Sequence, residues 1–216
     1  MPDPAPITAS LPSKLNISDI KQTTRHIILL LTCSLLLAVT VAAQRISFGL
    51  YAAEGITLTP LNSAELNFNE NHPVILAGET VTVNLSDAAV LTVEGQKDLD
   101  ITVTIDAPMT LDLDTCHIPL AVKFAYSNTG ALDVATAKSR AIQIPAGLGF
   151  TSATFPISRR LSGLPAPPPT PNYAGYSVPK GTVYLFVYGT LGKVPSGAAA
   201  GLYTGPINIR VEYAKY

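Results

Sequence analysis

The residues best suited to chemistry in this chain lie close together near its middle, at Asp112, Asp114, Cys116 and His117. A thiolate, an imidazole and carboxylates are the ligands that Zn²⁺ takes in proteins. If this segment is a strand, Asp112, Asp114 and Cys116 share one face and His117 points to the other, because successive strand side chains alternate. We therefore favour a solvated acidic face over a metal site.

A second group of carboxylates, Asp98, Asp100 and Asp106, has the oxygen ligands that Ca²⁺ requires, but not the spacing of an EF-hand loop. The sequence has no Gly-x-Ser-x-Gly elbow, no His-Glu-x-x-His pair and no phosphate loop. We expect no catalytic residue, metal or cofactor, and a non-enzymatic protein. A sandwich-fold enzyme acting on glycans is the remote alternative. The lack of Trp and the few aromatic residues in any one patch also weaken carbohydrate binding, which favours aromatic platforms.

The composition predicts a packed core. Of 216 residues, 47% are hydrophobic and 13% charged, the reverse of a disordered chain. The net charge is −1 and no basic patch is present, which argues against nucleic acid as a partner.

An apolar run at residues 26–43 predicts export. It has about the length of a signal-peptide core and falls short of the about 20 residues that span a bilayer. Basic residues precede it, and Val41–Ala43 ends it with small side chains. We predict a signal peptide at residues 1–43, cleaved after Ala43, with an uncleaved anchor or a later start as alternatives. The protein is then expected in the periplasm, at the surface or outside a Gram-negative-type bacterium, touching the membrane only during export.

Cleavage there removes Cys33 and leaves Cys116 as the one cysteine of the exported part. No disulfide can then form within the domain. A buried thiol acting as a small hydrophobic side chain is the simplest interpretation, and pairing between chains is the alternative.

The rest of the chain is predicted to form mainly β-strands. Roughly nine or ten segments with alternating apolar residues follow one another, with turn residues between them, as is typical of a β-sandwich. Residues 183–191 are apolar enough for a central strand, whereas residues 131–145 suit either one helical turn or a loose strand. Prolines at 163–171 predict a surface loop. The fold class is therefore all-β, with a single antiparallel sandwich over residues 56–216.

The two ends of this domain carry the segments of most interest. Ile207, Ile209, Val211 and Tyr213 alternate with polar residues, which predicts a strand with one buried face. Residues 44–55 form either an N-terminal extension or the first strand. A sandwich with an unpaired edge exposes backbone groups that another strand must cover.

Three segments carry a resemblance to a known family. They are Thr57–Leu61 with Glu65–Phe68, Val187–Leu191, and Gly201–Gly205 followed by the terminal strand. With these, the chain resembles the bacterial exported family known as domain of unknown function 4402. It is similar to the spore coat U domain and, more distantly, to chaperone–usher pilins. Asn69 stands where that family usually has Gly.

The resemblance implies an immunoglobulin-like, pilin-like sandwich at the cell surface, serving as a fimbrial or coat subunit. In pilins, a neighbour's N-terminal extension fills a groove by β-strand addition. The candidate donor residues here are Ile46, Phe48, Leu50, Ile56 and Leu58, and the candidate acceptor residues are Tyr203, Ile207, Ile209, Val211 and Tyr213. The partners would be like subunits and a periplasmic chaperone. The alternative is a self-complete monomeric surface or periplasmic binding module, in which residues 46–58 form its own first strand.

Overall fold

The computed structural model describes residues 45–69, 75–113, 115–146, 149–160, 177–198 and 201–215. The predicted signal peptide, with its cleavage site, and the proline-rich loop at 163–171 lie outside these residues. So does Asp114. Residues 41–216 form a compact unit of their own.

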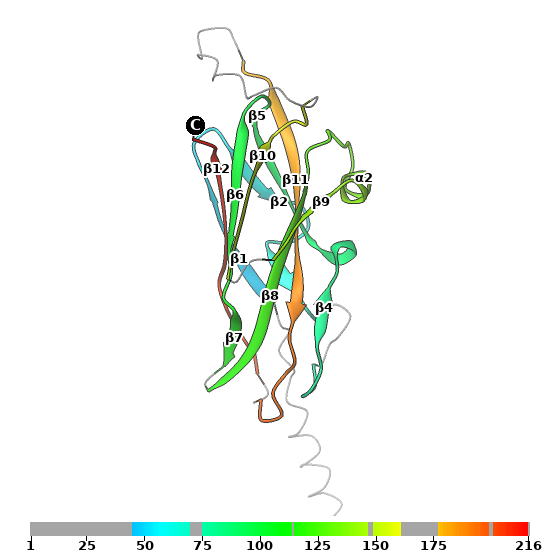
Figure 1. Cartoon of the computed structure of the whole chain (residues 1–216), viewed down its shortest axis with the longest axis vertical. Coiled ribbons are helices and arrows are strands. Elements are labelled where there is room, and N and C mark those ends of the chain that lie inside the picture. The colour runs from blue at the N-terminus through cyan, green and yellow to red at the C-terminus, as the bar shows by residue number, and fades with distance from the viewer. Residues whose placement is uncertain are drawn as a thin grey trace, which may run out of the picture. The chain divides into compact units, whose positions relative to one another are not determined.

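Strands dominate the described residues (Figure 1). In chain order the elements are β1 (Arg45–Ala52), β2 (Thr57–Pro60), β3 (Glu65–Asn67), β4 (Val81–Val83), the short 3₁₀ helix η1 (Leu85–Asp87), β5 (Ala89–Gln96), β6 (Asp100–Asp106), β7 (Thr110–Leu113), β8 (Cys116–Ser127), α2 (Val134–Ser139), β9 (Ile142–Ile144), β10 (Phe150–Pro156), β11 (Lys180–Leu191) and β12 (Ile207–Tyr213).

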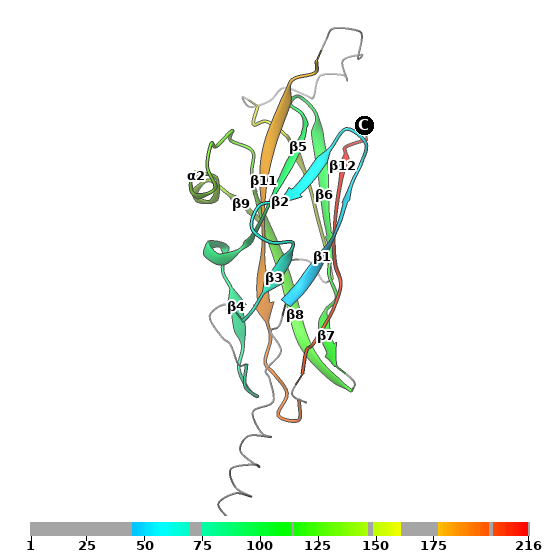
Figure 2. The same cartoon turned by 180° about the vertical axis from the view of Figure 1, so that it is seen from behind.

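These strands form two sheets (Figures 1 and 2). A five-stranded sheet has the order β10-β6-β12-β1-β3. A seven-stranded sheet has the order β2-β5-β11-β8-β7, with β4 added on β11 and β9 on β8. The predicted all-β architecture of two sheets is confirmed.

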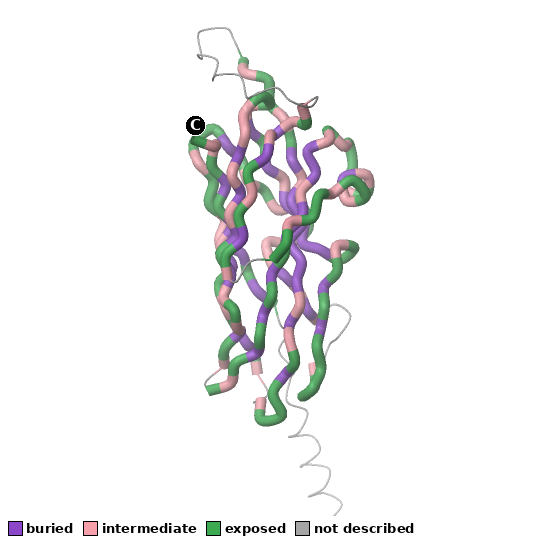
Figure 3. The backbone as a smooth tube through the Cα atoms, in the orientation of Figure 1, coloured by how far each residue is buried: buried purple, intermediate pink, exposed green. Residues whose placement is uncertain are grey.

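Alternating apolar residues from both sheets make one core. In the five-stranded sheet, Ile101 and Val103 of β6 are fully buried, and in the seven-stranded sheet so are Val183 and Val187 of β11. Buried positions alternate with more exposed ones along β6, whereas β11 is buried continuously from Leu185 to Gly189 (Figure 3). The rings of Tyr126 on β8 and Phe155 on β10 stack with centroids 3.7 Å apart, which ties the two sheets together.

Strand β11 is central, as its apolar sequence predicts. It pairs with β8 on one side, and with β5 and then β4 on the other. Its outward-facing Phe186 is nevertheless fully buried. The Nζ of Lys138 on α2 lies 5.9 Å from the Phe186 ring centroid and donates a hydrogen bond to the Ser86 carbonyl of η1. A short helix and a 3₁₀ turn therefore cover part of the outer face of this sheet.

The segment that the sequence left open resolves into two elements. Asp133 caps α2, because its carboxylate accepts a hydrogen bond from the Thr136 N–H at 2.8 Å. The chain then enters β9, an edge strand paired with β8. Of the two alternatives for residues 131–145, the helical turn is confirmed at Val134–Ser139.

Two expectations about the strands need correction. The described residues hold twelve strands rather than nine or ten, and five of them, β2, β3, β4, β7 and β9, are only three or four residues long. The sandwich is also not purely antiparallel, since β1 and β12 pair in parallel. The first and last strands of the domain run in the same direction here, and alternation within one strand carries no information about its partner's direction.

Candidate functional site

The two segments expected to meet at an assembly edge lie side by side within the chain (Figure 2). Phe48 of β1 is paired with Ile207 of β12, and Leu50 with Ile209. On its other side β12 pairs with β6. The sequence left open whether this edge of the terminal strand is closed by the same chain or by a neighbour, and in the single chain β1 covers it. We call the β1–β12 contact the seam.

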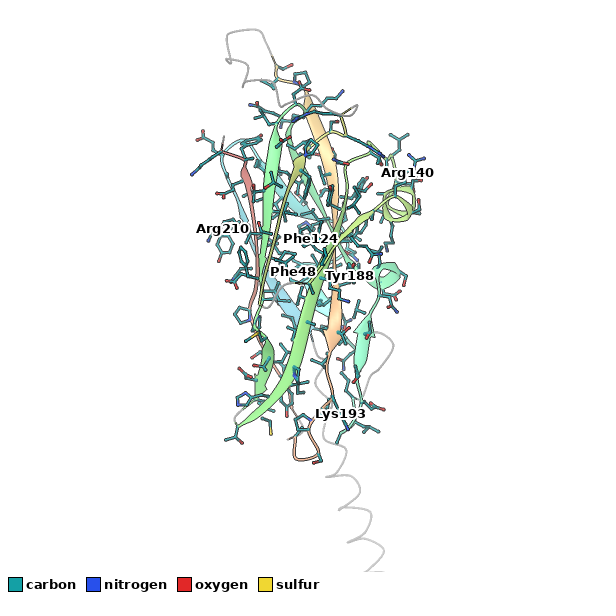
Figure 4. All side chains as sticks on the ribbon, in the orientation of Figure 1. Phe48, Phe124, Arg140, Tyr188, Lys193 and Arg210 are labelled. Carbon is teal, nitrogen blue, oxygen red and sulfur yellow. The ribbon has the colours of Figure 1, made fainter. Side chains whose placement is uncertain are left out.

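Strand β1 is built into the core. Ile46 is 1% exposed and Phe48 is 9% exposed, whereas Leu50 is only partly buried. Figure 4 shows Phe48 near the middle of the domain. The first three residues of β1 also pair with β3, and the Phe48 N–H donates a hydrogen bond to the Ala64 carbonyl at 2.7 Å. Residues 44–55 were predicted to form either an N-terminal extension or the first strand. In the structure, Arg45–Ala52 of this segment form the first strand, β1.

The candidate donor residues divide between the two sheets. Leu58 belongs to β2, which pairs with β5 in the seven-stranded sheet. Between β1 and β2 the chain turns at Ala53–Ile56, where Gly55 has a φ of 79° and Ile56 is buried. The Ile56 N–H donates to the Ala53 carbonyl at 3.1 Å. Of the candidate donor residues, only Phe48 and Leu50 are therefore paired with β12, whereas Ile46 is paired with Leu66 of β3.

Four of the five candidate acceptor residues lie on β12, whereas Tyr203 precedes it, next to the bridge between Thr204 and Asp112 of β7. Ile207, Ile209 and Val211 are fully buried on β12, and Tyr203 is buried just before it. The Tyr213 hydroxyl donates a hydrogen bond to the Gly55 carbonyl and accepts one from the Gln96 N–H, both at 3.0 Å. The last residue of β12 therefore fastens the turn that follows β1.

The suggested metal ligands near residue 112 are arranged differently from the expectation. A hairpin turn separates β7 from β8, so Asp112 and Cys116 lie on different strands rather than on one face of one strand. Asp112 instead faces His117 across the hairpin, with 2.6 Å between a carboxylate oxygen and Nδ1. Hydrogen bonds from His117 and Thr110 hold the pKa of Asp112 below its ordinary value. The Cys116 thiol is half-buried and donates to the Gly197 carbonyl at 3.4 Å.

The suggested calcium ligands are spread out. Asp100 begins β6, where it pairs with Arg160, and Asp106 ends the strand. Six residue-to-residue steps along the strand place them about 20 Å apart. Across the described ranges, no three His, Cys, Asp or Glu side chains come together as a metal site would need.

Sequence reasoning missed one further group of residues. Six side chains from four neighbouring strands line a hollow of about 240 Å³ on the outer face of the five-stranded sheet. They are Tyr51, Thr104, Asp106, Phe150, Asn208 and Arg210. They lie far apart in the sequence, and only the register of the sheet brings them together.

The fold and the seam define the class: an all-β protein of two sheets whose first strand completes its core beside its last. No protein-family model and no curated protein matches this sequence. The resemblance to the exported surface family stays a prediction. Within the part of the chain that the structure describes, no helix has the length and apolar character needed to cross a membrane.

Proposed function

We propose that this chain is an exported, non-enzymatic structural subunit of a bacterial surface, of fimbrial or coat type, with an immunoglobulin-like sandwich fold. In this proposal, copies assemble by exchanging β1 across the seam. The observation that carries it is the place of β1: it is the first strand of the domain, yet its apolar side chains belong to the core.

Exchange would preserve the contacts of β1. Its partners are β12 and β3. A second copy can supply the same strand in the same register, so the closed and exchanged forms differ mainly at the turn Ala53–Ile56. Exchange of an identical element is a low-cost route to assembly, and such a turn is its hinge.

Removal of β1 from its place beside β12 would open the core and leave the edge of β12 unpaired, so binding of another strand there would be favourable. Burial of Ile46 and Phe48 contributes about 2 kcal/mol each. The vacated edge of β12 would also expose unpaired backbone groups, which attract another strand. A chaperone could pair one of its strands with the open edge of β12 during export. The β1 strand of a like subunit would then displace the chaperone strand.

A self-complete surface module is the second candidate. The observation that favours it is the pairing of β1 and β12 within one chain. Such a protein would stay monomeric, and its function would rest on its surface.

Hinge length separates the two candidates. Insertion of Gly-Ser-Gly after Glu54 lengthens the hinge, and relaxed hinges disfavour exchange. We expect the protein purified after export to show, by light scattering, masses that are multiples of one subunit, and the insertion variant to shift toward a single subunit. The control is the same insertion after the exposed Gly197, which should keep the original distribution. A single-subunit mass for the unmodified protein at every concentration would refute exchange and leave the self-complete module.

A further inference from the structure

The outer-face hollow, lined by the six residues named above, is built from two adjacent rows of side chains that cross the five-stranded sheet. In one row, Phe150, Asp106, Asn208 and Gly49 are successive partners on β10, β6, β12 and β1. In the next row, the partners are Ser152, Thr104, Arg210 and Tyr51. These residues alternate along their strands with buried core residues, so their side chains leave the sheet on its outer side. Figure 4 shows Arg210 on the outside of β12.

Gly49 keeps the floor of the hollow low. A Cβ atom at this position would collide with Asn208 Oδ1 and would come within 3.2 Å of the Tyr51 ring. The absence of a side chain therefore lets the Asn208 amide and the Tyr51 ring approach each other over β1.

The polar groups at the centre of the hollow are available to a ligand. Among the described residues, Arg210 and Asp106 form no ion pair with each other or with another side chain. The side chain of Asn208 likewise has no hydrogen-bond partner among the described residues. One cation, one anion and an amide that both donates and accepts thus line the same small space. An anionic ligand would meet Asp106 and a cationic ligand would meet Arg210, so the set favours a neutral molecule rich in hydroxyl groups.

Aromatic side chains stand at both ends of the hollow. Tyr51 is 54% exposed and Phe150 is 58% exposed, although large apolar side chains are usually buried. They lie on strands three spacings apart, about 14 Å, with the charged and amide groups between them. Apolar ring faces beside convergent polar groups are the usual composition of a small-molecule site. Sequence reasoning found few aromatic residues in any one patch, whereas the register of this sheet places two exposed rings on either side of one set of polar groups.

We propose that the outer-face hollow binds a neutral sugar, with Asp106, Asn208 and Arg210 hydrogen-bonding its hydroxyl groups and Tyr51 and Phe150 contacting it from the two ends of the hollow. This goes beyond the structural role proposed above. The hollow forms whether β1 comes from the same chain or from a neighbour, so sugar binding and strand exchange can fail independently.

The test is calorimetric titration of the protein, purified after expression of the full chain, with methyl glucoside, methyl galactoside, methyl mannoside, N-acetylglucosamine, lactose and maltose. Glucuronate and inorganic phosphate serve as anionic probes. We expect saturable binding of at least one neutral sugar below about 10 mM. Asp106→Asn and Arg210→Gln should each weaken it about tenfold or more, because each removes a hydrogen bond to a charged group. Glu212→Gln is the matched control, since Glu212 is exposed on the same strand and face but does not line the hollow.

Amide chemical-shift changes at Asn208 and Arg210 in the unmodified protein give a second readout that needs no variant. Flat titrations for every neutral sugar would overturn the proposal. Binding of glucuronate or phosphate alone would overturn it as well, and so would neutral-sugar binding that Asp106→Asn and Arg210→Gln leave unchanged.

Discussion

A chain that lacks residues 44–53 is expected to lose its stable fold and to recover it when a peptide spanning Arg45–Ala52 is added. The deletion removes β1, exposes the β12 edge and takes Ile46 and Phe48 out of the core. Burial of these two side chains alone contributes about 4 kcal/mol to the stability of the domain. Since whole domains are stable by only about 5–15 kcal/mol, this loss and the open edge together should leave little folded protein.

The measurement is thermal unfolding, followed by circular dichroism, of the truncated chain with increasing amounts of peptide. We expect saturable recovery of a cooperative transition. The control is the same peptide with Ile46→Asp and Phe48→Asp, which can offer the backbone of β1 but not its apolar face, and it should have no effect. A truncated chain that unfolds at the same temperature as the full chain, without peptide, would show that β1 is dispensable.

Gly189→Ala is expected to destabilise the protein by about 3 kcal/mol, near the upper end for overpacked core positions. Gly189 lies in β11 with its α-carbon facing the core, opposite Val122 of β8. An added Cβ would collide with the Ala121 carbonyl oxygen and come within 3.3 Å of the Val122 Cα. These are backbone atoms of a paired strand, so the neighbour cannot rotate away and the sheet must spread.

For a domain of this size, such a loss lowers the midpoint of thermal unfolding by about 6–12 °C. Gly197→Ala provides the comparison, because nothing lies within 4 Å of the added Cβ and the backbone there needs no positive φ. It should leave the midpoint unchanged or raise it slightly, since alanine restricts the unfolded chain. Equal midpoints for the two variants would contradict the packing described for β11.

The sequence predicts most of this fold because period-2 alternation survives in the longer strands. Residues 99–105 and 207–213 show it clearly and form β6 and β12, and the continuous apolar run at residues 183–191 forms the central strand β11. Local chemistry also marks the capped turn at Asp133, although it does not decide between helix and strand. What alternation cannot supply is the choice of partner. The parallel pairing of β1 with β12 joins residues at opposite ends of the domain, and no local pattern encodes it.

The same limit explains what the sequence missed or misplaced at the candidate sites. Asp112 and Cys116 are an even number of residues apart, which would place them on one face of a single strand. The turn between β7 and β8 instead puts Asp112 opposite His117. The outer-face hollow draws Tyr51, Asp106, Phe150 and Arg210 from four strands, and each is unremarkable in its own segment. Register across a sheet, which arises from the whole core, brings them together.

The central claim, that copies join by exchanging β1, is tested most directly by a cysteine pair across the seam. Tyr51 and Arg210 are exposed partners on β1 and β12. Adjacent strands lie about 4.8 Å apart, within the range that a disulfide spans.

The protein with Tyr51→Cys and Arg210→Cys, in which Cys33 and Cys116 are replaced by Ser, would be oxidised on cells that export it. Its products would then be separated by non-reducing electrophoresis. Tyr51→Cys with Thr104→Cys is the mismatched control, because β1 and β6 are two strand spacings apart. Exchange predicts a ladder of covalently linked subunits for the matched pair alone. A single band at the mass of one subunit, carrying an internal disulfide, would contradict it.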